Sequence, residues 1–392
     1  MRFVRSGVRS VSLRRGPGAW RGLDWTHLMK VAIAAIFLVA PALWIARGRV
    51  QSRPPPFPTY SMTDLGTLGG TTLAFGISDT GLIVGTSARA DGIGRAFLWK
   101  KGAMTDLGTL GGQYSGAYGV NDEGEVVGSA QNSEGEWRAF LWRDGAMHDL
   151  GTLGGHYSSA RSINSQHEIV GSSILANGKA AHAFLLRGGK LQDLGTLGGA
   201  ESGATDINDS GVVTGFSEIR PGNHLRHAFK WERGKFVDLG ALSGKWSEAS
   251  SVNAHGLIVG RSETWWRGEV RAFLYDGRRM TNLGTLGVGG MYSESYGIND
   301  EGWIVGSAST NRGPVHAFVY HLGDKRDLND LIGGKGESVL QDAVGVNNKG
   351  QIIARGYESI TAPFHAFLLT PVTPASPKRH STGLGTSAVA GT

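Results

Sequence analysis

A phrase of seven residues, Asp-Leu-Gly-Thr-Leu-Gly-Gly, recurs along most of the chain and limits what the chain can fold into. Four full copies and three altered copies begin at Asp64, Asp106, Asp149, Asp193, Asp238, Asn282 and Asp327. Neighbouring copies are 42 to 45 residues apart. A fixed period of this length means that the fold is built from seven equivalent units stacked side by side.

Each unit contains four short segments of strand-like sequence. In the second unit, a segment rich in small residues ends at Asn121 and is followed by segments at 126–128, 138–142 and 146–150. Turns containing Gly, Asn or Asp separate the segments, and the chain holds 62 glycines in all. Four strands repeated at this period predict an all-β, seven-bladed β-propeller made of four-stranded antiparallel blades.

The two ends of the repeat region predict how the ring closes. Residues 60–65 read as a fourth strand with no preceding three, and residues 365–370 read as a third strand with no fourth. Pairing these two segments completes the seventh blade and leaves no sheet edge open. One phenylalanine per unit is the expected core residue: Phe97, Phe140, Phe184, Phe229, Phe273, Phe318 and Phe367.

The segment before the repeats predicts one N-terminal hydrophobic helix for export or anchoring. A basic leader at 1–30 precedes an apolar run at 31–46, which is a transmembrane anchor or the core of a signal peptide, and a Pro-rich linker at 47–59 follows. Sixteen residues of helix reach roughly 24 Å, less than a ~30 Å hydrocarbon core. Whether the leader is cleaved therefore stays open. The basic residues before the run place the body, 60–370, across the membrane.

Charge and cysteine content exclude several classes of function. The formal net charge is +6, but the excess of Lys and Arg lies in the N-terminal segment and in the tail at 371–392, which has a disordered-type composition. The repeat body is slightly acidic, which argues against binding to nucleic acid. The chain has no cysteine, so disulfides and thiolate metal sites are excluded.

The connections between strands differ in how much their lengths vary. The connections from the first to the second strand and from the third to the fourth strand keep constant lengths, whereas the other two kinds vary. The two variable kinds lie together on one face of a propeller, which is the candidate binding face. Aromatic side chains that suit sugar rings or peptides, or that pack between blades, gather there: Tyr114, Trp137, Tyr157, Trp246, Trp265, Trp266 and Tyr292.

No motif in the chain predicts a metal, a cofactor or a catalytic centre. Histidines recur at one repeat position, but other units place arginine there, so we interpret this position as a structural hydrogen-bond donor. No serine-nucleophile elbow, phosphate loop or His-Glu-x-x-His motif occurs. The inner strands bring Arg161, Asp206 and Asp342 toward the ring axis, which keeps hydrolytic chemistry open as an alternative.

The repeated phrases His-Ala-Phe, Asp-Leu-Gly-Thr-Leu-Gly-Gly and Ile-Asn-Asp-x-Gly resemble those of the HAF-repeat family of extracellular bacterial repeat proteins. The resemblance covers residues 60–370, with Arg in place of His in three units, Ser78 in place of Asn, and an altered phrase at 327–332. It implies a bacterial protein that works outside the cytoplasm, and it brings no catalytic residues.

Together these features lead us to expect a non-enzymatic binding or scaffolding module of the bacterial cell envelope, either anchored in the inner membrane or secreted. Its partner would be a glycan, a peptide or an envelope protein. Two alternatives stay open: a propeller-type hydrolase or lyase acting on an extracellular polymer, and a purely structural envelope protein.

Overall fold

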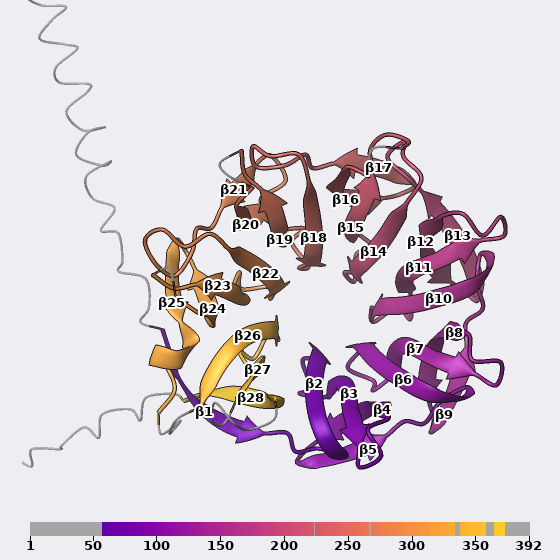
Figure 1. Cartoon of the computed structure of the whole chain (residues 1–392), viewed down its shortest axis with the longest axis horizontal. Helices are drawn as coiled ribbons and strands as arrows, with labels where there is room; N and C mark the ends of the chain where they lie inside the picture. Colours follow the sequence, from indigo (N-terminus) through magenta and orange to yellow (C-terminus); the bar gives the residue numbers. More distant parts are fainter. Residues whose placement is uncertain are drawn as a thin grey trace, which may run out of the picture. The chain divides into compact units, whose positions relative to one another are not determined.

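The computed structural model describes residues 57–222, 224–265, 268–311, 313–333, 338–357 and 364–372. Within these ranges the chain forms β-strands joined by turns, with one short 3₁₀ turn, η1, at Leu328–Asp330. The strands form seven four-stranded antiparallel sheets, and the sheets follow one another around a central axis (Figure 1). The predicted all-β propeller is confirmed.

Each blade presents its first strand to the axis and its fourth strand to the outside. The innermost strands are β2 (Gly69–Ile77), β6 (Gly111–Val120), β10 (Gly154–Ile163), β14 (Ser202–Ile207), β18 (Ser247–Val252), β22 (Ser293–Ile298) and β26 (Val339–Val346). The second strands are β3 (Ile83–Arg89), β7 (Val126–Asn132), β11 (Ile169–Leu175), β15 (Val213–Glu218), β19 (Ile258–Glu263), β23 (Ile304–Ser309) and β27 (Ile352–Tyr357).

The outer half of each blade is equally regular. The third strands are β4 (Gly94–Lys100), β8 (Trp137–Arg143), β12 (Ala181–Arg187), β16 (Arg226–Glu232), β20 (Val270–Tyr275), β24 (Val315–His321) and β28 (Phe364–Val372). The outermost strands are β5 (Ala103–Asp106), β9 (Ala146–Asp149), β13 (Lys190–Gly195), β17 (Lys235–Asp238), β21 (Met280–Asn282), β25 (Asp324–Asp327) and β1 (Thr59–Asp64). Blades are numbered here from blade 1 (β2–β5) to blade 7 (β26–β28 with β1).

The ring is closed by the two ends of the repeat region. β1 pairs antiparallel with β28, and the register runs from Thr59 opposite Val372 to Asp64 opposite Phe367. The next residue, Leu65, continues the pairing by donating its backbone N–H to the carbonyl oxygen of Ala366 at 3.0 Å. The seventh blade is thus completed by the first strand of the body, as the sequence predicted.

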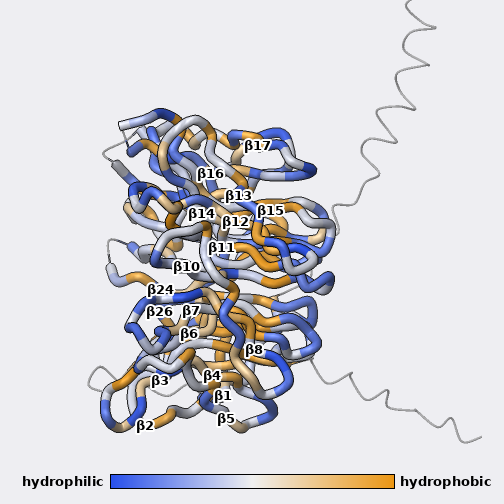
Figure 2. The backbone as a smooth tube through the Cα atoms, turned by 90° about the vertical axis from the view of Figure 1, so that its right-hand side faces the viewer, coloured by the Kyte–Doolittle hydropathy of each residue, from blue (hydrophilic) through white to orange (hydrophobic). Residues whose placement is uncertain are grey.

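The repeated phenylalanine forms the centre of each blade, and a glycine lies opposite it in six blades, with Ala354 at that position in blade 7. Phe140 is fully buried and lies opposite Gly128 in the β7–β8 register. A Cβ added at Gly128 would be 2.0 Å from the carbonyl oxygen of Gly116 and 2.8 Å from the Phe140 ring, so no larger residue fits. Seen from the side, hydrophobic stretches recur along the strands of the blades (Figure 2).

The Asp-Leu-Gly phrase links one blade to the next through hydrogen bonds and a buried leucine. In blade 1, Asp106 accepts the backbone N–H of Gly108 at 2.8 Å, and Leu107 is buried between the blades. The hydroxyl of Ser115, at the start of the next inner strand, donates to Gly108 and accepts from Ala96. The repeated aspartate therefore caps a turn, which explains its recurrence without a bound ion.

The N-terminal leader, the apolar run at 31–46 and the tail from residue 373 lie outside the described residues. Within the described ranges, no helix is long and apolar enough to cross a membrane.

Candidate functional site

The strand order assigns the connections to two faces of the ring. The constant connections, from first to second and from third to fourth strands, lie on one face, which we call the constant-loop face. The variable connections lie on the opposite face, which we call the variable-loop face. Every described aromatic candidate lies in or beside a variable connection.

The seven candidate aromatics differ in exposure. Trp265 is 72% exposed and Tyr114 is 41% exposed. The half-buried candidates are Trp137, Tyr157, Trp246 and Tyr292. Trp266 lies outside the described residues.

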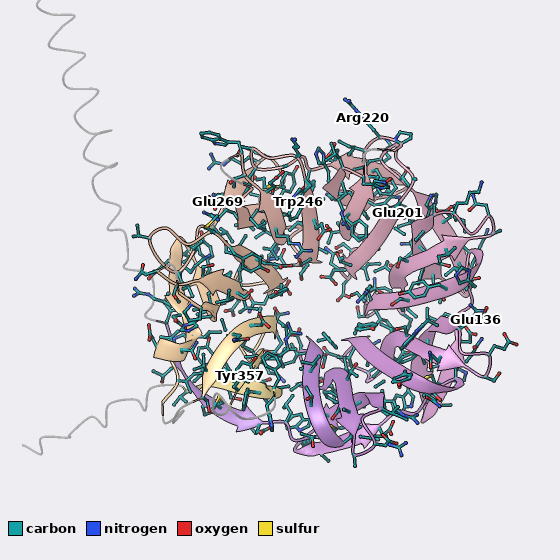
Figure 3. The ribbon with its side chains drawn as sticks, viewed as in Figure 1. Glu136, Glu201, Arg220, Trp246, Glu269 and Tyr357 are labelled. Atoms are coloured by element: carbon teal, nitrogen blue, oxygen red, sulfur yellow. The ribbon has the colours of Figure 1, made fainter. Side chains whose placement is uncertain are left out.

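Two of the candidates, Trp246 and Tyr292, line one cavity of about 420 Å³. Trp246 directly precedes β18 in blade 5 (Figure 3), and Tyr292 directly precedes β22 in blade 6. The volume is within the range of about 300–1,000 Å³ that is usual for ligand sites. The cavity spans blades 4, 5 and 6, and its remaining lining residues are His224, Leu225, Arg226, Glu248, Arg261 and Val270. We call it the Trp246 pocket.

A network of paired charges forms one wall of the Trp246 pocket. Glu248 Oε1 lies 2.9 Å from Arg226 Nη1, and Glu248 Oε2 accepts a hydrogen bond from Arg261 Nε at 2.9 Å. Arg261 Nη1 also donates to Glu294 Oε2 at 3.1 Å. Arg226 comes from blade 4, Glu248 and Arg261 from blade 5, and Glu294 from blade 6. The network therefore ties three blades together at the pocket.

Tyr292 connects this network to the aromatic side of the pocket. Its hydroxyl donates to Glu294 Oε2 at 2.6 Å. Burial and the nearby Glu294 charge raise the pKa of the Tyr292 hydroxyl above its ordinary value, so it stays protonated. Burial alone would lower the pKa of Arg261, but Glu294 and Glu248 raise it above the ordinary value. Tyr292 and Arg261 thus keep their protons, and remain donors, across the neutral pH range.

Sequence reasoning missed the charged residues of the Trp246 pocket, although a signal for them exists. Glu248 stands in the inner strand where blades 2 and 4 carry Gly116 and Gly203, and Arg261 stands in the second strand where blade 2 carries Ser129. Paired departures from a repeat, acidic in one strand and basic in its neighbour, mark a place where a blade differs in chemistry.

The recurring histidines hold the outer hairpins together. His182, His227 and His316 each place Nδ1 within hydrogen-bonding distance of the Asp of the Asp-Leu-Gly phrase, for example 2.8 Å between His182 and Asp193. His365 makes the same contact with Asp64 across the closure, at 2.9 Å. This geometry agrees with the structural interpretation of that repeat position.

A second cavity, of about 370 Å³, lies on the axis and includes Arg161 and Asp206. The Arg161 guanidinium carbon lies 4.5 Å from the Tyr118 ring centroid. Both oxygens of Asp206 are engaged, because Asp206 accepts hydrogen bonds from Ser162, Ser251 and two backbone N–H groups. Burial raises the pKa of the Asp206 carboxyl, against the effect of these bonds.

Asp342, the third residue expected near the axis, does not line this cavity. Its carboxylate oxygen Oδ2 accepts a hydrogen bond from Arg355 Nη2 at 3.1 Å. The axial cavity therefore brings together two of the three residues proposed for hydrolytic chemistry.

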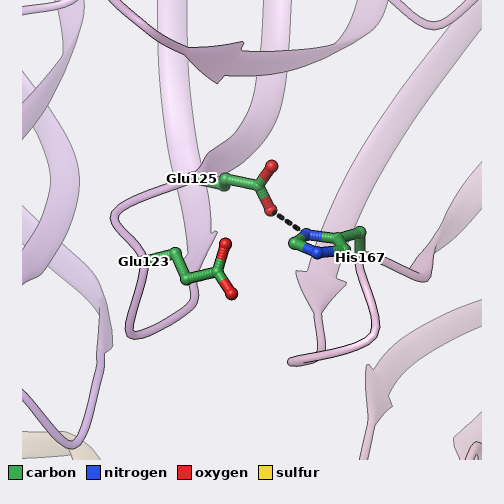
Figure 4. A group of neighbouring side chains, drawn as sticks. All are labelled: Glu123, Glu125 and His167. Carbon is green, nitrogen blue, oxygen red and sulfur yellow. Dashed lines mark hydrogen bonds and ion pairs between the residues drawn. The ribbon is translucent and has the colours of Figure 1, made fainter.

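Glu123, Glu125 and His167 form a third cluster, at the constant-loop face (Figure 4). One ligand atom from each lies within 4.8 Å of the others, so the three could hold a metal ion. His167 Nδ1 lies 2.7 Å from Glu125 Oε2, which also accepts from the Asn121 amide. These contacts make the cluster an ion pair between blades 2 and 3. Glu125 and His167 lie one repeat apart in the chain, so no local sequence motif marks the cluster.

Seven closed, four-stranded antiparallel blades define the class of this protein as a seven-bladed β-propeller. No family model matches the chain, and no curated protein matches it. Solved structures share its fold at low sequence identity. A puromycin-hydrolyzing peptidase from Mycobacterium tuberculosis is 12% identical with a TM-score of 0.51, and the match covers 81% of this chain and 55% of the peptidase.

Two further structures are more distant. An acylaminoacyl peptidase from Pyrococcus horikoshii is 12% identical with a TM-score of 0.49, covering 79% of this chain and 54% of that protein. TolB from Acinetobacter baumannii is 9% identical with a TM-score of 0.42, covering 74% of this chain and 64% of TolB. The chain thus spans just over half the length of the two peptidases. Likenesses at this identity show the fold alone.

Proposed function

We propose that this chain is a non-enzymatic binding module of the bacterial cell envelope and that its variable-loop face binds a glycan. The observation that carries the proposal is the Trp246 pocket, where two ring systems stand beside a wall of paired charges. Aromatic rings offer apolar area to the C–H faces of a sugar, and fixed polar groups satisfy its hydroxyls. The resemblance to HAF-repeat proteins agrees with a location outside the cytoplasm.

The test is a binding screen on the purified full chain against envelope and extracellular polysaccharides. Selective binding raises the melting temperature because the ligand stabilises only the folded state. We expect a shift with at least one polysaccharide, and we expect Trp246→Ala to abolish it. Tyr114→Ala, an exposed aromatic of the same face in blade 2, is the matched control and should keep the shift.

The location is tested separately from binding. A protease added to intact spheroplasts should cut the body if the body lies outside the cytoplasm. Protection of the body until the membrane is lysed would contradict this part of the proposal.

A hydrolase or lyase is the second candidate, and one observation favours it: Arg161 and Asp206 share the axial cavity, and burial raises the pKa of Asp206. The four hydrogen bonds to Asp206 speak for a structural role instead. Turnover of a polysaccharide that disappears in Arg161→Gln and Asp206→Asn would establish the enzyme and overturn the binding proposal. A chain that neither binds nor turns over any polysaccharide would fit a structural envelope protein.

A further inference from the structure

We propose that the Trp246 pocket selects saccharides that carry a carboxylate and that Arg226 is the residue that recognises this group. The inference rests on the proposed glycan binding and adds a ligand class to it. It follows from which parts of the charge network face the solvent.

The arginines of the network are more exposed than the glutamates. The side chains of Arg226 and Arg261 are 47% and 35% exposed, whereas those of Glu248 and Glu294 are 15% and 10% exposed. Two positive and two negative charges balance in total. The surface that a ligand meets is nevertheless the cationic side of the network.

Glu248, the glutamate that lines the pocket, has little capacity left to accept from a ligand. Glu248 holds Arg226 at one oxygen and two nitrogens of Arg261 at the other. Glu294 Oε2 accepts from both Arg261 and the Tyr292 hydroxyl. A sugar hydroxyl approaching the pocket therefore finds donors more readily than acceptors.

Arg226 is the donor with free capacity. Arg261 uses all three of its guanidinium nitrogens on Glu248 and Glu294. The Arg226 side chain has one ion pair, through Nη1 to Glu248, and its other guanidinium nitrogens form no hydrogen bond or ion pair with the described residues. Its guanidinium carbon lies 5.1 Å from the Phe216 ring centroid, which supports the side chain from one side. A guanidinium held in this way can donate two parallel hydrogen bonds to a carboxylate.

Trp246 and Tyr292 supply the second half of the recognition. The Arg261 guanidinium carbon lies 5.7 Å from the Trp246 ring centroid and steadies the indole. A sugar ring that stacks on these aromatics would bring a substituent within reach of Arg226, because all three residues line the same cavity. A carboxylate is the sugar substituent that matches the unused donors of Arg226.

The test compares uronate oligosaccharides with their carboxyl-reduced forms, which keep the ring stereochemistry and lose the charge. The probes are oligomers of galacturonate, mannuronate and glucuronate, measured by calorimetry on the full chain. We expect at least one uronate oligomer to bind at least about ten-fold more tightly than its reduced form, which is the effect of one charge-assisted hydrogen bond or more.

Variants of the chain show which residue causes the difference in affinity between the uronate and its reduced form. Arg226→Gln should lower the affinity for the uronate to that of the reduced form, and Arg226→Lys, which can keep the ion pair with Glu248, should give an intermediate affinity. Arg220→Gln changes an exposed arginine that does not line the pocket and should leave the affinity unchanged. Melting curves without ligand show that each variant is folded.

The outcomes separate this inference from the proposed function. Equal affinity for acidic and reduced sugars, abolished by Trp246→Ala, overturns the carboxylate inference and leaves glycan binding intact. Absence of binding to any saccharide overturns both. Binding of an oligoglutamate peptide that depends on Arg226, without sugar binding, also overturns both and assigns the pocket to an acidic peptide.

Discussion

Asn347 donates its side-chain amide to the backbone carbonyl oxygen of Ser78, 3.0 Å away, and so joins the last blade to the first across 269 residues of sequence. The same bond joins four other pairs of neighbouring blades, from Asn164, Asn208, Asn253 and Asn299 to the residue at the same position in the next blade. In five of the seven blades, the asparagine that follows the inner strand therefore links its blade to the next one.

Asn299→Ala should destabilise the propeller. The substitution removes the amide donor to Asn347 and the Oδ1 acceptor of the Trp303 N–H, and both partners are left without that bond. We expect a loss of about 1–3 kcal/mol in the free energy of unfolding, measured by urea denaturation. Asn177→Ala, in an exposed turn, is the control and should change stability by less than about 0.5 kcal/mol. Equal effects of the two variants would contradict the fastening role.

Ser78→Asn should stabilise the chain. Ser78 occupies the position of the fastening asparagine in blade 1, and its short side chain bonds to Thr80 in its own turn instead of reaching the next blade. An asparagine there can donate to the carbonyl oxygen of Asn121, as its counterparts do. We expect a gain of about 0.5–1.5 kcal/mol in the same denaturation experiment. A lower stability would mean that this position cannot hold the longer side chain.

His167→Gly should raise the melting temperature more at pH 9 than at pH 6. His167 has a φ of 60°, a left-handed conformation that the other six blades give to glycine at this position, such as Gly124 and Gly211. Glycine removes that backbone strain at every pH. In the wild type, the contact with Glu125 offsets this strain most strongly while His167 is charged.

The sign of this pH effect follows from the pKa of His167, which the hydrogen bond and charge of Glu125 raise above the ordinary value of 6.5. A raised folded pKa gives stability that is fully present below the unfolded pKa and is lost as the pH rises through the folded pKa. His167→Gln keeps the strain and removes the charge. It should melt below the wild type at pH 6 and close to it at pH 9, and a pH-independent difference would exclude the ion pair as the cause.

Lys325→Met should stabilise the chain at pH 7. Burial, together with the charge of Arg271, lowers the pKa of Lys325 to about 7. The Lys325 Nζ donates to Gly284 at 2.7 Å, and among the described residues no carboxylate forms an ion pair with it. The unfolded chain holds this proton up to about pH 10.5, so the stability of the wild type rises between pH 7 and 10.5. The advantage of the methionine variant should therefore shrink over this range.

Thermal melts at pH 7, 8.5 and 10 measure this change. Lys349→Met removes an exposed lysine and is the control. A Lys325→Met variant that loses stability at pH 7 would show that the bond to Gly284 and the contact with the Phe318 ring outweigh the cost of burying the charge.

The fold could be predicted from the sequence because its determinants recur. The residues at the positions of Phe140, Gly128 and the Asp-Leu-Gly phrase contact equivalent neighbours in successive blades. A recurring sequence pattern therefore corresponds to a recurring set of contacts. The closure of the ring could also be predicted, because the unpaired fourth strand at the start of the repeats and the third strand at their end complete one blade.

The candidate site could be predicted only in part, because its residues depart from the repeat. Trp246 and Tyr292 were predicted as aromatics in variable connections, but Tyr114 and Tyr157, which have the same sequence context, do not line the Trp246 pocket. Trp246 and Tyr292 differ from Tyr114 and Tyr157 because the Glu248–Arg261 pair lies beside them. The effect of this pair depends on side-chain burial across three blades. Such burial is a property of the packed structure and is not visible in a repeat pattern.

Tyr60→Ala should show how much the closing strand contributes to stability. Tyr60 is 3% exposed, lies in β1 among the core residues of blades 6 and 7, and donates its backbone N–H to Leu331 at 2.9 Å. Truncation of a buried aromatic costs about 3–5 kcal/mol. If β1 seals the ring, the variant should also unfold less cooperatively, because β28 becomes a partly open edge. Ser61→Ala, at the adjacent exposed position of β1, is the control. Urea denaturation gives both the midpoint and the slope, and a Tyr60→Ala curve that overlays the control would mean that the buried Tyr60 side chain contributes nothing to the closure of the ring.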